Sequence, residues 1–299
     1  MEKWQLEQMI ALPLEAKIQK SYARIREWYE HYNGNVAVSF SGGKDSSVLL
    51  KLVRDIYPDV EAVFFDTGLE FPEIRELVKN TPNCRMIKPK MNFKDVILKY
   101  GYPVATKEQA HYISQLRNNP TEILKNKLIN GIDKKGNITK FKLSKCWHKL
   151  LTAPFKVSNS CCDVMKKTPS KKYEKETGNK MFIGIVYGDS AIRNKYYLKN
   201  GCNSFDAKRP QSKPLSFWTE KDIWEFIKMD NVIYSKVYDM GYARTGCVFC
   251  AFGCHLEKGE NRFQKLRKTH PALYDYCFKT VESGGLGMSE VLEYIGLAR

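Results

Sequence analysis

Apolar and polar residues follow one another along the chain with two different periods, and these periods predict its secondary structure. Residues 36–40 (Val-Ala-Val-Ser-Phe) form a short run rich in β-branched side chains, which is typical of a buried strand in a parallel sheet. Residues 48–53 then place Val and Leu at the spacing of an amphipathic helix. A strand that turns directly into a helix is the building unit of a doubly wound α/β fold.

The same two patterns recur further along the chain. They predict strands at residues 60–65, 84–87 and 182–186, a helix at residues 14–32 and another at residues 92–100.

A capping signal marks one more helix, because Thr219 is followed by Asp222 at the third helical position. The neighbouring Trp218 and Trp224 are expected to be packing residues.

From these strands and helices we predict an α/β fold, Rossmann-like and doubly wound, with a mostly parallel sheet. It is preceded by an N-terminal helical segment (residues 1–34), occupies residues 35–225 with a basic insertion at about 114–160, and ends in a Cys-rich helical appendage (residues 226–299).

The turn between the first strand and its helix has the composition of an anion-binding loop. It reads Ser39-Phe40-Ser41-Gly42-Gly43-Lys44-Asp45-Ser46-Ser47. The first N–H groups of a helix have no partner within it, and they point with the helix dipole toward one spot. Glycine lets a phosphate approach the backbone, while lysine adds a cation and serine adds hydroxyl donors. Because Asp45 follows Lys44, the spacing is not that of a Walker A loop. The alternative is an ordinary strand–helix turn.

A carboxylate follows the second predicted strand. Asp66 comes directly after residues 60–65, and ligands of open parallel sheets gather where strands end. There Asp66 would contact a ribose hydroxyl, an adenine edge or Mg²⁺. The alternative is that Asp66 caps the helix that begins near Glu73.

Nine cysteines in a chain without a signal-peptide pattern argue for reduced thiols and against a disulfide scaffold. Cys161 and Cys162 are adjacent, and Cys247 and Cys250 form a Cys-x-x-Cys turn with Cys254 close behind. Four thiolates suit a [4Fe–4S] cluster or a tetrahedral zinc ion. The alternatives are a redox-active Cys-x-x-Cys pair or cysteines that merely pack as small hydrophobes.

The net charge of +16 is concentrated in one part of the chain. Residues 125–213 hold 21 Lys and Arg against 6 Asp and Glu, which is nearly the whole excess. This distribution favours a polyanionic partner, either a multiply charged nucleotide or a nucleic acid, over a merely solubilising surface. No stretch approaches the roughly 18 consecutive apolar residues that a membrane span requires. We therefore expect a cytoplasmic protein that does not engage a membrane.

Several blocks together resemble the phosphoadenosine phosphosulfate reductase family within the PP-loop superfamily, whose fold is called adenine nucleotide alpha hydrolase-like. The resemblance extends over residues 36–254. Its blocks are Ser39 to Ser46, Asp66-Thr67-Gly68, Cys161-Cys162 with Lys166-Lys167, Gly184 with Asp189-Ser190 and Arg193, the segment from Trp218 to Trp224, and Gly241-Tyr242 before Cys247 and Cys250. The cysteine pattern resembles the cluster-bearing, adenylyl-sulfate reductase branch.

The resemblance implies a set of site residues. Implied nucleotide-binding residues are Ser39, Ser41, Gly42, Gly43, Lys44, Asp45, Ser46, Asp66, Thr67, Gly68, Gly184, Ser190 and Arg193, of which Lys44, Asp45 and Arg193 are the catalytic candidates. Lys166 and Lys167 are implied to bind the anionic end of the substrate. A [4Fe–4S] cluster, with zinc as the alternative, is implied on Cys161, Cys162, Cys247 and Cys250, with Cys254 as a substitute ligand.

The chain departs from the family pattern at two places. Its tail lacks the Glu-Cys-Gly-Leu-His motif that carries the nucleophilic cysteine of the reductases, and its loop is an intact Ser-Gly-Gly-Lys-Asp-Ser. Such a loop is kept by members that split ATP into AMP and pyrophosphate.

Three hypotheses follow from the resemblance and its departures. The first is a sulfonucleotide reductase that acts on adenylyl sulfate or its 3′-phosphate with a thiol or thioredoxin-type reductant. The second is an ATP pyrophosphatase that uses Mg²⁺ and activates an acceptor, such as tRNA or DNA, for sulfur insertion. The third is a nucleotide-binding regulator without turnover.

Overall fold

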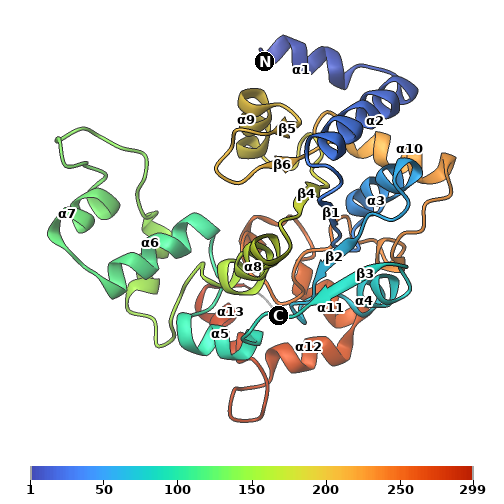
Figure 1. Cartoon of the computed structure of the whole chain (residues 1–299). Coiled ribbons are helices and arrows are strands. Elements are labelled where there is room, and N and C mark those ends of the chain that lie inside the picture. Colours follow the sequence, from blue (N-terminus) through green and yellow to red (C-terminus); the bar gives the residue numbers. More distant parts are fainter. Residues whose placement is uncertain (1, 298–299) are drawn as a thin grey trace. The chain divides into compact units, whose positions relative to one another are not determined.

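The computed structural model describes residues 2–297, apart from the side chains of residues 191 and 192, and it has the predicted α/β architecture (Figure 1). The chain divides into two compact units, each built from separate stretches of sequence. Unit 1 consists of residues 2–66, 70–88 and 169–245, and unit 2 of residues 67–69, 89–168 and 246–297. These bounds differ from the three consecutive segments predicted from the sequence, because the N-terminal helix packs within unit 1 and the insertion groups with the C-terminal residues.

A six-stranded sheet forms the centre of unit 1. Its strand order is β3-β2-β1-β4-β6-β5, and all neighbours are parallel except β5 and β6. The strands are β1 (Val36–Ser39), β2 (Ala62–Phe65), β3 (Cys84–Ile87), β4 (Lys180–Ile183), β5 (Asn203–Ser204) and β6 (Gln211–Ser212). The order runs outward from β1 in both directions, so the sheet is doubly wound, and β1 lies where the direction reverses.

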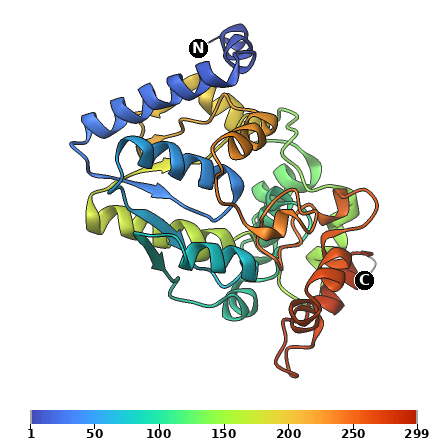
Figure 2. The same ribbon diagram turned by 90° about the vertical axis from the view of Figure 1, so that its right-hand side faces the viewer.

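Helices cover both faces of this sheet. The helices of unit 1 are α1 (Lys3–Ile10), α2 (Leu14–His31), α3 (Lys44–Ile56), α4 (Pro72–Lys79), α8 (Thr168–Thr177, except its first residue), α9 (Ala191–Asn200), α10 (Glu220–Met229) and the short η4 (Lys236–Tyr238). Helix α3 packs on β1 and β4, with α2 and α10 packed on α3 in turn. Tyr173 of α8 joins Ala37, Val63 and Met181 in the core on the other face, and Figure 2 shows α3 and α8 on opposite sides of the sheet.

Unit 2 is largely helical. Its elements are α5 (Phe93–Tyr100), α6 (Lys107–Asn118), α7 (Glu122–Lys125), η1 (Asn126–Asn130), η2 (Lys145–Leu151), η3 (Asp163–Lys167), η5 (Cys254–Leu256), α11 (Arg262–Thr269), α12 (Pro271–Phe278) and α13 (Met288–Tyr294). The predicted helix at residues 92–100 is confirmed as α5, which Asn92 caps by accepting the N–H of Asp95. No helix among the described residues has the length and apolar character needed to cross a bilayer.

Two predicted boundaries were wrong. The strand predicted at residues 182–186 is β4, which begins at Lys180 and ends at Ile183. Gly184, the next residue, lies against the backbone of α3, where an added Cβ would be 3.1 Å from the carbonyl carbon of Asp45. The sequence pattern did not predict the short antiparallel pair β5–β6.

Trp218 is the packing residue that its context predicts. It is fully buried, and its indole N–H donates to Ser21 Oγ at 2.9 Å, which joins α2 to the segment before α10. We expect Trp218→Ala to lower the free energy of unfolding by about 3–5 kcal/mol, because it removes a large buried side chain and leaves Ser21 without its donor. Urea unfolding measures this, and an equally stable variant would contradict the packing role. Relative rates on different nucleotides should stay unchanged.

Candidate active site

The predicted anion-binding loop is folded as a turn between β1 and α3, and its serines hold it in shape. Ser46 Oγ donates to Gly43 O at 2.8 Å and lies 3.0 Å from Ser41 Oγ. Gly42 has a φ of +69°, and a Cβ there would come within 2.8 Å of the Ile74 side chain. Only glycine fits this position without displacement. Gly43 occupies the N-cap of α3 without a side-chain cap, so the first turn of α3 can offer N–H groups to an anion.

Lys44 and Asp45 form an ion pair at the start of α3. Lys44 is buried, with Nζ 3.1 Å from Asp45 Oδ1 and 3.4 Å from Glu220 Oε1. Burial lowers the pKa of Lys44, but Asp45, Tyr238 and Glu220 together outweigh burial, so the pKa is raised and the ammonium group stays charged. Burial raises the pKa of Asp45, and the charges of Asp189 and Glu220 raise it further. A phosphate beside this pair would therefore meet a fixed cation.

Tyr238 was not identified from the sequence. Its hydroxyl accepts the backbone N–H of Lys44 at 2.9 Å and lies 3.3 Å from Thr245 Oγ1. The Tyr238 ring centroid is 5.8 Å from Lys44 Nζ. Tyr238 thus takes up one of the N–H groups at the helix start. The 194 positions between Tyr238 and Lys44 explain why no local pattern reveals this contact.

The end of β4 brings further predicted residues to the same edge of the sheet. Gly184 lies against the backbone of Asp45 and Ser46. Ser190 caps α9 by accepting the N–H of Arg193 at 3.2 Å, and Arg193 Nη1 donates to Asp189 Oδ2 at 2.7 Å. The side chain of Arg193 is about half exposed. Since Asp189 raises the pKa of Asp45, the β4–α9 loop lies close to the anion-binding loop.

Asp66 lies where predicted, at the end of β2, but it is already paired. It is buried, and its Oδ2 accepts from Arg75 Nη2 at 3.0 Å. The alternative role as a helix cap is wrong, since α4 begins at Pro72 with Phe71 at its N-cap. Thr67 and Gly68 belong to unit 2.

Lys213 is another buried cation in unit 1 that the sequence did not single out. It follows β6, is 6% exposed, and holds Nζ 3.6 Å from the Tyr196 ring centroid. Burial lowers the pKa of Lys213 to about 8, and the charge of Arg193 contributes. The charged form of Lys213 is therefore less stable in the folded chain than in the unfolded one.

Because the pKa of Lys213 is lowered on folding, the effect of Lys213→Met on stability should depend on pH. Below pH 8 the charge of Lys213 lowers the free energy of unfolding by its full amount, and this loss of stability vanishes as the pH rises from about 8 to 10.5. We expect the variant to be more stable than the parent by about 2 kcal/mol at pH 7, after allowance for the lost ring contact. The difference should approach zero near pH 10.5. Urea unfolding of both proteins at pH 7 and pH 10 measures it, and a gain that grows with pH would contradict the assignment.

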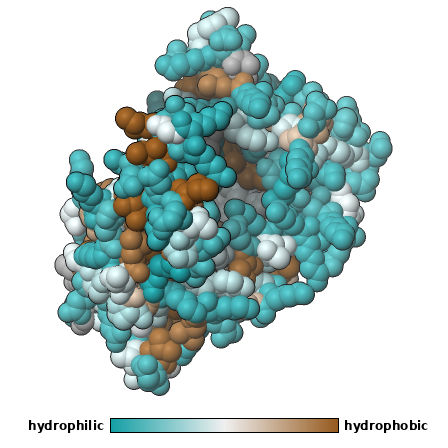
Figure 3. Space-filling model, turned by 90° about the vertical axis from the view of Figure 1, so that its left-hand side faces the viewer, coloured by the Kyte–Doolittle hydropathy of each residue, from teal (hydrophilic) through white to brown (hydrophobic). Residues whose placement is uncertain are grey.

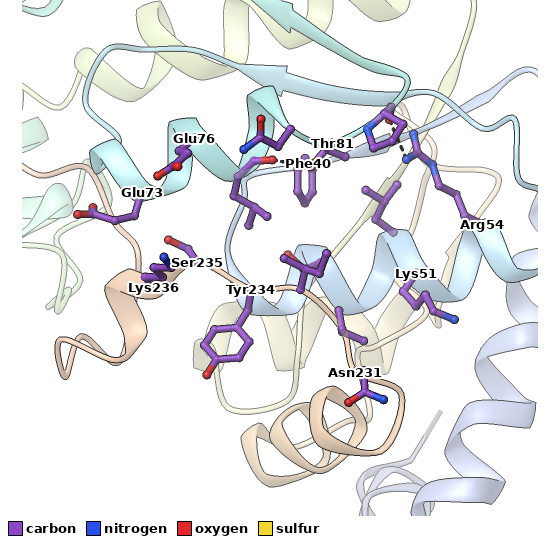
Figure 4. A pocket seen from close by; sticks show the side chains of 17 residues that line it. Phe40, Lys51, Arg54, Glu73, Glu76, Thr81, Asn231, Tyr234, Ser235 and Lys236 are labelled. Carbon is purple, nitrogen blue, oxygen red and sulfur yellow. Dashed lines mark hydrogen bonds between the residues drawn. The ribbon is translucent and has the colours of Figure 1, made fainter.

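A cavity of about 600 Å³ lies elsewhere in unit 1 and is not the predicted nucleotide site. A stripe of α3 lines it (Ser47, Leu50, Lys51 and Arg54), together with α4 and residues 231–236. Figure 4 shows Lys51 and Arg54 at one end and Glu73 and Glu76 at the other. Of the residues around the loop, only Phe40 and Ser47 line this cavity.

Unit 2 brings the four predicted metal-ligating cysteines together. The adjacent thiols of Cys161 and Cys162 interact, and this interaction together with burial raises the pKa of Cys161. The charges of Cys250 and Cys247 raise it further, and Cys247 and Cys162 in turn act on Cys250, whose pKa is raised to about 11 mainly by burial. Each of the four thiols therefore lies within electrostatic reach of at least two of the others.

Two lysine side chains act electrostatically on Cys162, one of the four thiols. The interaction with the Cys161 thiol lowers the pKa of Cys162, and the charges of Lys107 and Lys166 lower it further. Lys107, at the start of α6, was not predicted. Lys167 instead pairs with Asp163, with Nζ 2.6 Å from Oδ1. Of the two predicted anion-binding lysines, Lys166 thus acts on a thiol.

The other cysteines have different surroundings. Cys254 is buried beside Glu257 and Arg262, and burial raises its pKa to about 12. Cys277 is fully buried, which raises its pKa well above the usual range. Cys146 is the exposed thiol among the nine cysteines. In the described part of the chain, no three His, Cys, Asp or Glu side chains are arranged closely enough to hold a metal ion as they stand.

The fold and the loop define the class: an α/β protein with a glycine-containing strand–helix turn and a buried lysine at the carboxyl edge of a mostly parallel sheet. The family model described as the phosphoadenosine phosphosulfate reductase domain matches residues 35–125 and 103–252. The chain belongs to this family.

Individual relatives are distant. An uncharacterized protein of Methanocaldococcus jannaschii is 26% identical over 281 residues, which cover 91% of this chain and 54% of that protein, so the chain spans about half its length. An adenosine 5′-phosphosulfate reductase of Anoxybacillus flavithermus is 26% identical over 280 residues, which cover 92% of this chain and 98% of the relative. The crystal structure of phosphoadenylyl-sulfate (PAPS) reductase from Candida auris in a phosphate complex has 15% identity and a TM-score of 0.45, covering 83% of this chain and 96% of that one.

Proposed function

We propose that this chain is a sulfonucleotide reductase, which binds adenylyl sulfate or phosphoadenylyl sulfate at the loop from Ser39 to Ser46. The observation that carries the proposal is the buried Lys44 at an uncapped helix start, within a chain of this family. The amides of the loop and Lys44 would hold the α-phosphate, and Arg193 would donate to a further anionic oxygen. Asp66 would face the nucleoside.

The reaction needs a thiolate that attacks the sulfonate sulfur. A sulfur–sulfur bond forms, the bond from sulfur to the phosphate oxygen breaks, and AMP or its 3′-phosphate leaves with the electron pair. A second thiol then displaces sulfite, and the two thiols end as a disulfide. Because Cys254 and Cys277 are buried with raised pKa values, both are poor nucleophiles. We infer that a thioredoxin-type dithiol supplies both thiols.

The four clustered thiols fit an iron–sulfur centre in donor chemistry and in number. Cys161, Cys162, Cys247 and Cys250 would hold a [4Fe–4S] cluster, which supplies redox-active iron when bound; four thiolates would equally hold zinc. The fit rests on their mutual electrostatic contact and on the cations at Cys162. Cys254, with Glu257 and Arg262 as its neighbours, fits the set less well.

A second candidate function is an ATP pyrophosphatase coupled to sulfur insertion. The intact loop favours it, as do the carboxylate of Asp45 beside Lys44 and the charge of Asp189 that acts on Asp45, since such oxygens suit Mg²⁺ bound to a triphosphate.

One product assay separates the candidates. Anaerobically purified protein is incubated with adenylyl sulfate, phosphoadenylyl sulfate or ATP, a thioredoxin-type dithiol and Mg²⁺. Sulfite and AMP in equal amounts from a sulfonucleotide are the result we expect. Pyrophosphate from ATP without sulfite supports the second candidate. ATP binding with neither product would contradict both and leave a regulatory module.

A further inference from the structure

A strongly basic hairpin projects from unit 2, and neither the family nor the proposed reaction accounts for it. We define the basic hairpin as residues 125–145, which lie between α6 and the body of η2 and include η1 (Figure 1). It holds seven lysines and one acidic residue, Asp133. The lysines are Lys125, Lys127, Lys134, Lys135, Lys140, Lys142 and Lys145, and all seven are exposed.

The charge of the basic hairpin is not neutralised within the chain. Lys125 pairs with Glu122, whose side chain is itself 86% exposed. Among the described residues, the ammonium groups of the other six lysines make no ion pair. Asp133 stabilises the turn, since its Oδ1 accepts hydrogen bonds from the backbone N–H groups of Lys135 and Asn137 at 2.8 and 2.9 Å. These bonds, the one from Asn137 first, lower the pKa of Asp133.

The lysines stand on an ordered scaffold. Leu128 and Leu143 anchor the base of the hairpin, both almost fully buried, with the N–H of Leu143 donating to Leu128 O at 2.6 Å. An antiparallel bridge joins Ile132 to Ile138. The side chain of Gln109, on α6, makes two hydrogen bonds to the backbone of the hairpin. Its Nε2 donates to Lys142 O at 3.1 Å, and its Oε1 accepts from Ser144 N at 2.7 Å. The backbone that carries the lysines is thus held in place and needs little ordering on binding.

Apolar side chains stand exposed between these lysines. Ile138 is 93% exposed and Phe141, flanked by Lys140 and Lys142, is 51% exposed. Figure 3 faces the left-hand side of the view in Figure 1 and shows hydrophobic side chains exposed among hydrophilic ones. Lysines beside an exposed aromatic ring suit single-stranded nucleic acid, because the lysines can contact its phosphates while the ring stacks on an unpaired base. A membrane surface would instead require one wide apolar face.

We propose that the basic hairpin binds single-stranded nucleic acid, with its lysines on the phosphates and Phe141 against a base. The proposal does not rest on the reductase assignment, because the hairpin shares no residue with the anion-binding loop or the four clustered thiols. It adds a polymeric partner to a protein whose nucleotide site lies in unit 1.

Fluorescence anisotropy with a labelled 20-nucleotide oligouridylate and oligothymidylate tests this on the full-length chain. The triple variant K134Q/K135Q/K140Q is compared with K171Q/K172Q/K175Q, which removes three exposed lysines from α8. We expect the hairpin variant to bind about tenfold or more weakly at 150 mM salt, with a slope of log K against log salt reduced by about 2. The α8 variant should lose far less. Phe141→Ala should weaken binding about fivefold or more without changing the slope.

Several outcomes would overturn the proposal. Equal losses in the two triple variants would show that total charge alone matters. Equal affinity for a 20-base-pair duplex, or unchanged affinity in Phe141→Ala, would exclude single-strand recognition. Tighter binding to vesicles of anionic lipid, displaced by the oligonucleotide, would assign the surface to a membrane. Thermal melts and sulfite release report whether each variant folds, and both should be unchanged, so failure of the reductase assay leaves this test intact.

Discussion

The Lys44→Ala variant is expected to release AMP from a sulfonucleotide about 100-fold or more slowly than the parent protein, because it removes a charged donor aimed at the phosphate. Lys44 is suited to this role because burial and two nearby carboxylates hold its ammonium group in one place. The fold should survive, since the remaining partner Asp45 has a raised pKa and can take up a proton. Initial rates under saturating dithiol measure the effect, and circular dichroism confirms folding.

Lys51→Ala is the matched control for this prediction. Lys51 lies on the same helix α3, but it pairs with Asp55 and Asp230 and lines the separate cavity. Its removal should leave the rate within about twofold of the parent, as for most surface changes away from a site. Normal turnover by folded Lys44→Ala protein would remove the loop from the mechanism. An equal loss in both variants would point to a defect of α3 as a whole.

The Cys247→Ser and Cys250→Ser variants are expected to lose most of their bound iron, and with it any brown colour after anaerobic purification. Each change takes one of four clustered thiols away and leaves a hydroxyl group, which is a poorer ligand for iron. Cys250 is the stronger test, since its thiol interacts with both Cys247 and Cys162. Metal analysis per chain measures the loss, and it also distinguishes iron from zinc.

Two serine variants serve as controls for the metal prediction. Cys146 is exposed and Cys254 interacts with Glu257 and Arg262, so Cys146→Ser and Cys254→Ser should keep their metal content. Loss of metal in Cys254→Ser with retention in Cys250→Ser would exchange the two residues in the ligand set. Unchanged iron in both Cys247→Ser and Cys250→Ser would exclude this Cys-x-x-Cys turn as a ligand pair.

Features that depend on neighbouring residues were predictable from the sequence. The anion-binding loop is one, because β1, its glycines and the start of α3 are consecutive in the chain. The cap of α10 is another: Thr219 Oγ1 accepts the N–H of Asp222 at 3.3 Å, as the Thr-x-x-Asp pattern predicts. That Cys161 and Cys162 approach Cys247 and Cys250 followed from the family resemblance and not from spacing.

Contacts between distant residues were not predictable, although they shape the site. The hydroxyl of Tyr238 on the N–H of Lys44, the pairing of Arg75 with Asp66 and the effect of the Lys107 charge on Cys162 each depend on the folded chain. The burial of Lys213 likewise depends on where the antiparallel pair β5–β6 places it. The hairpin in the basic insertion could not be predicted either. It is anchored by two buried leucines and Gln109, and so few anchoring residues leave no periodic pattern in the sequence.

The central claim is that an adenosine compound places its phosphate on the turn between β1 and α3. The most direct test is the structure of crystals grown anaerobically with adenylyl sulfate. The account predicts density for the phosphate within hydrogen-bonding distance of the Gly43 region and Lys44 Nζ. A nucleotide bound in the cavity lined by Leu50 and Lys51, with the loop empty at saturating ligand, would contradict it.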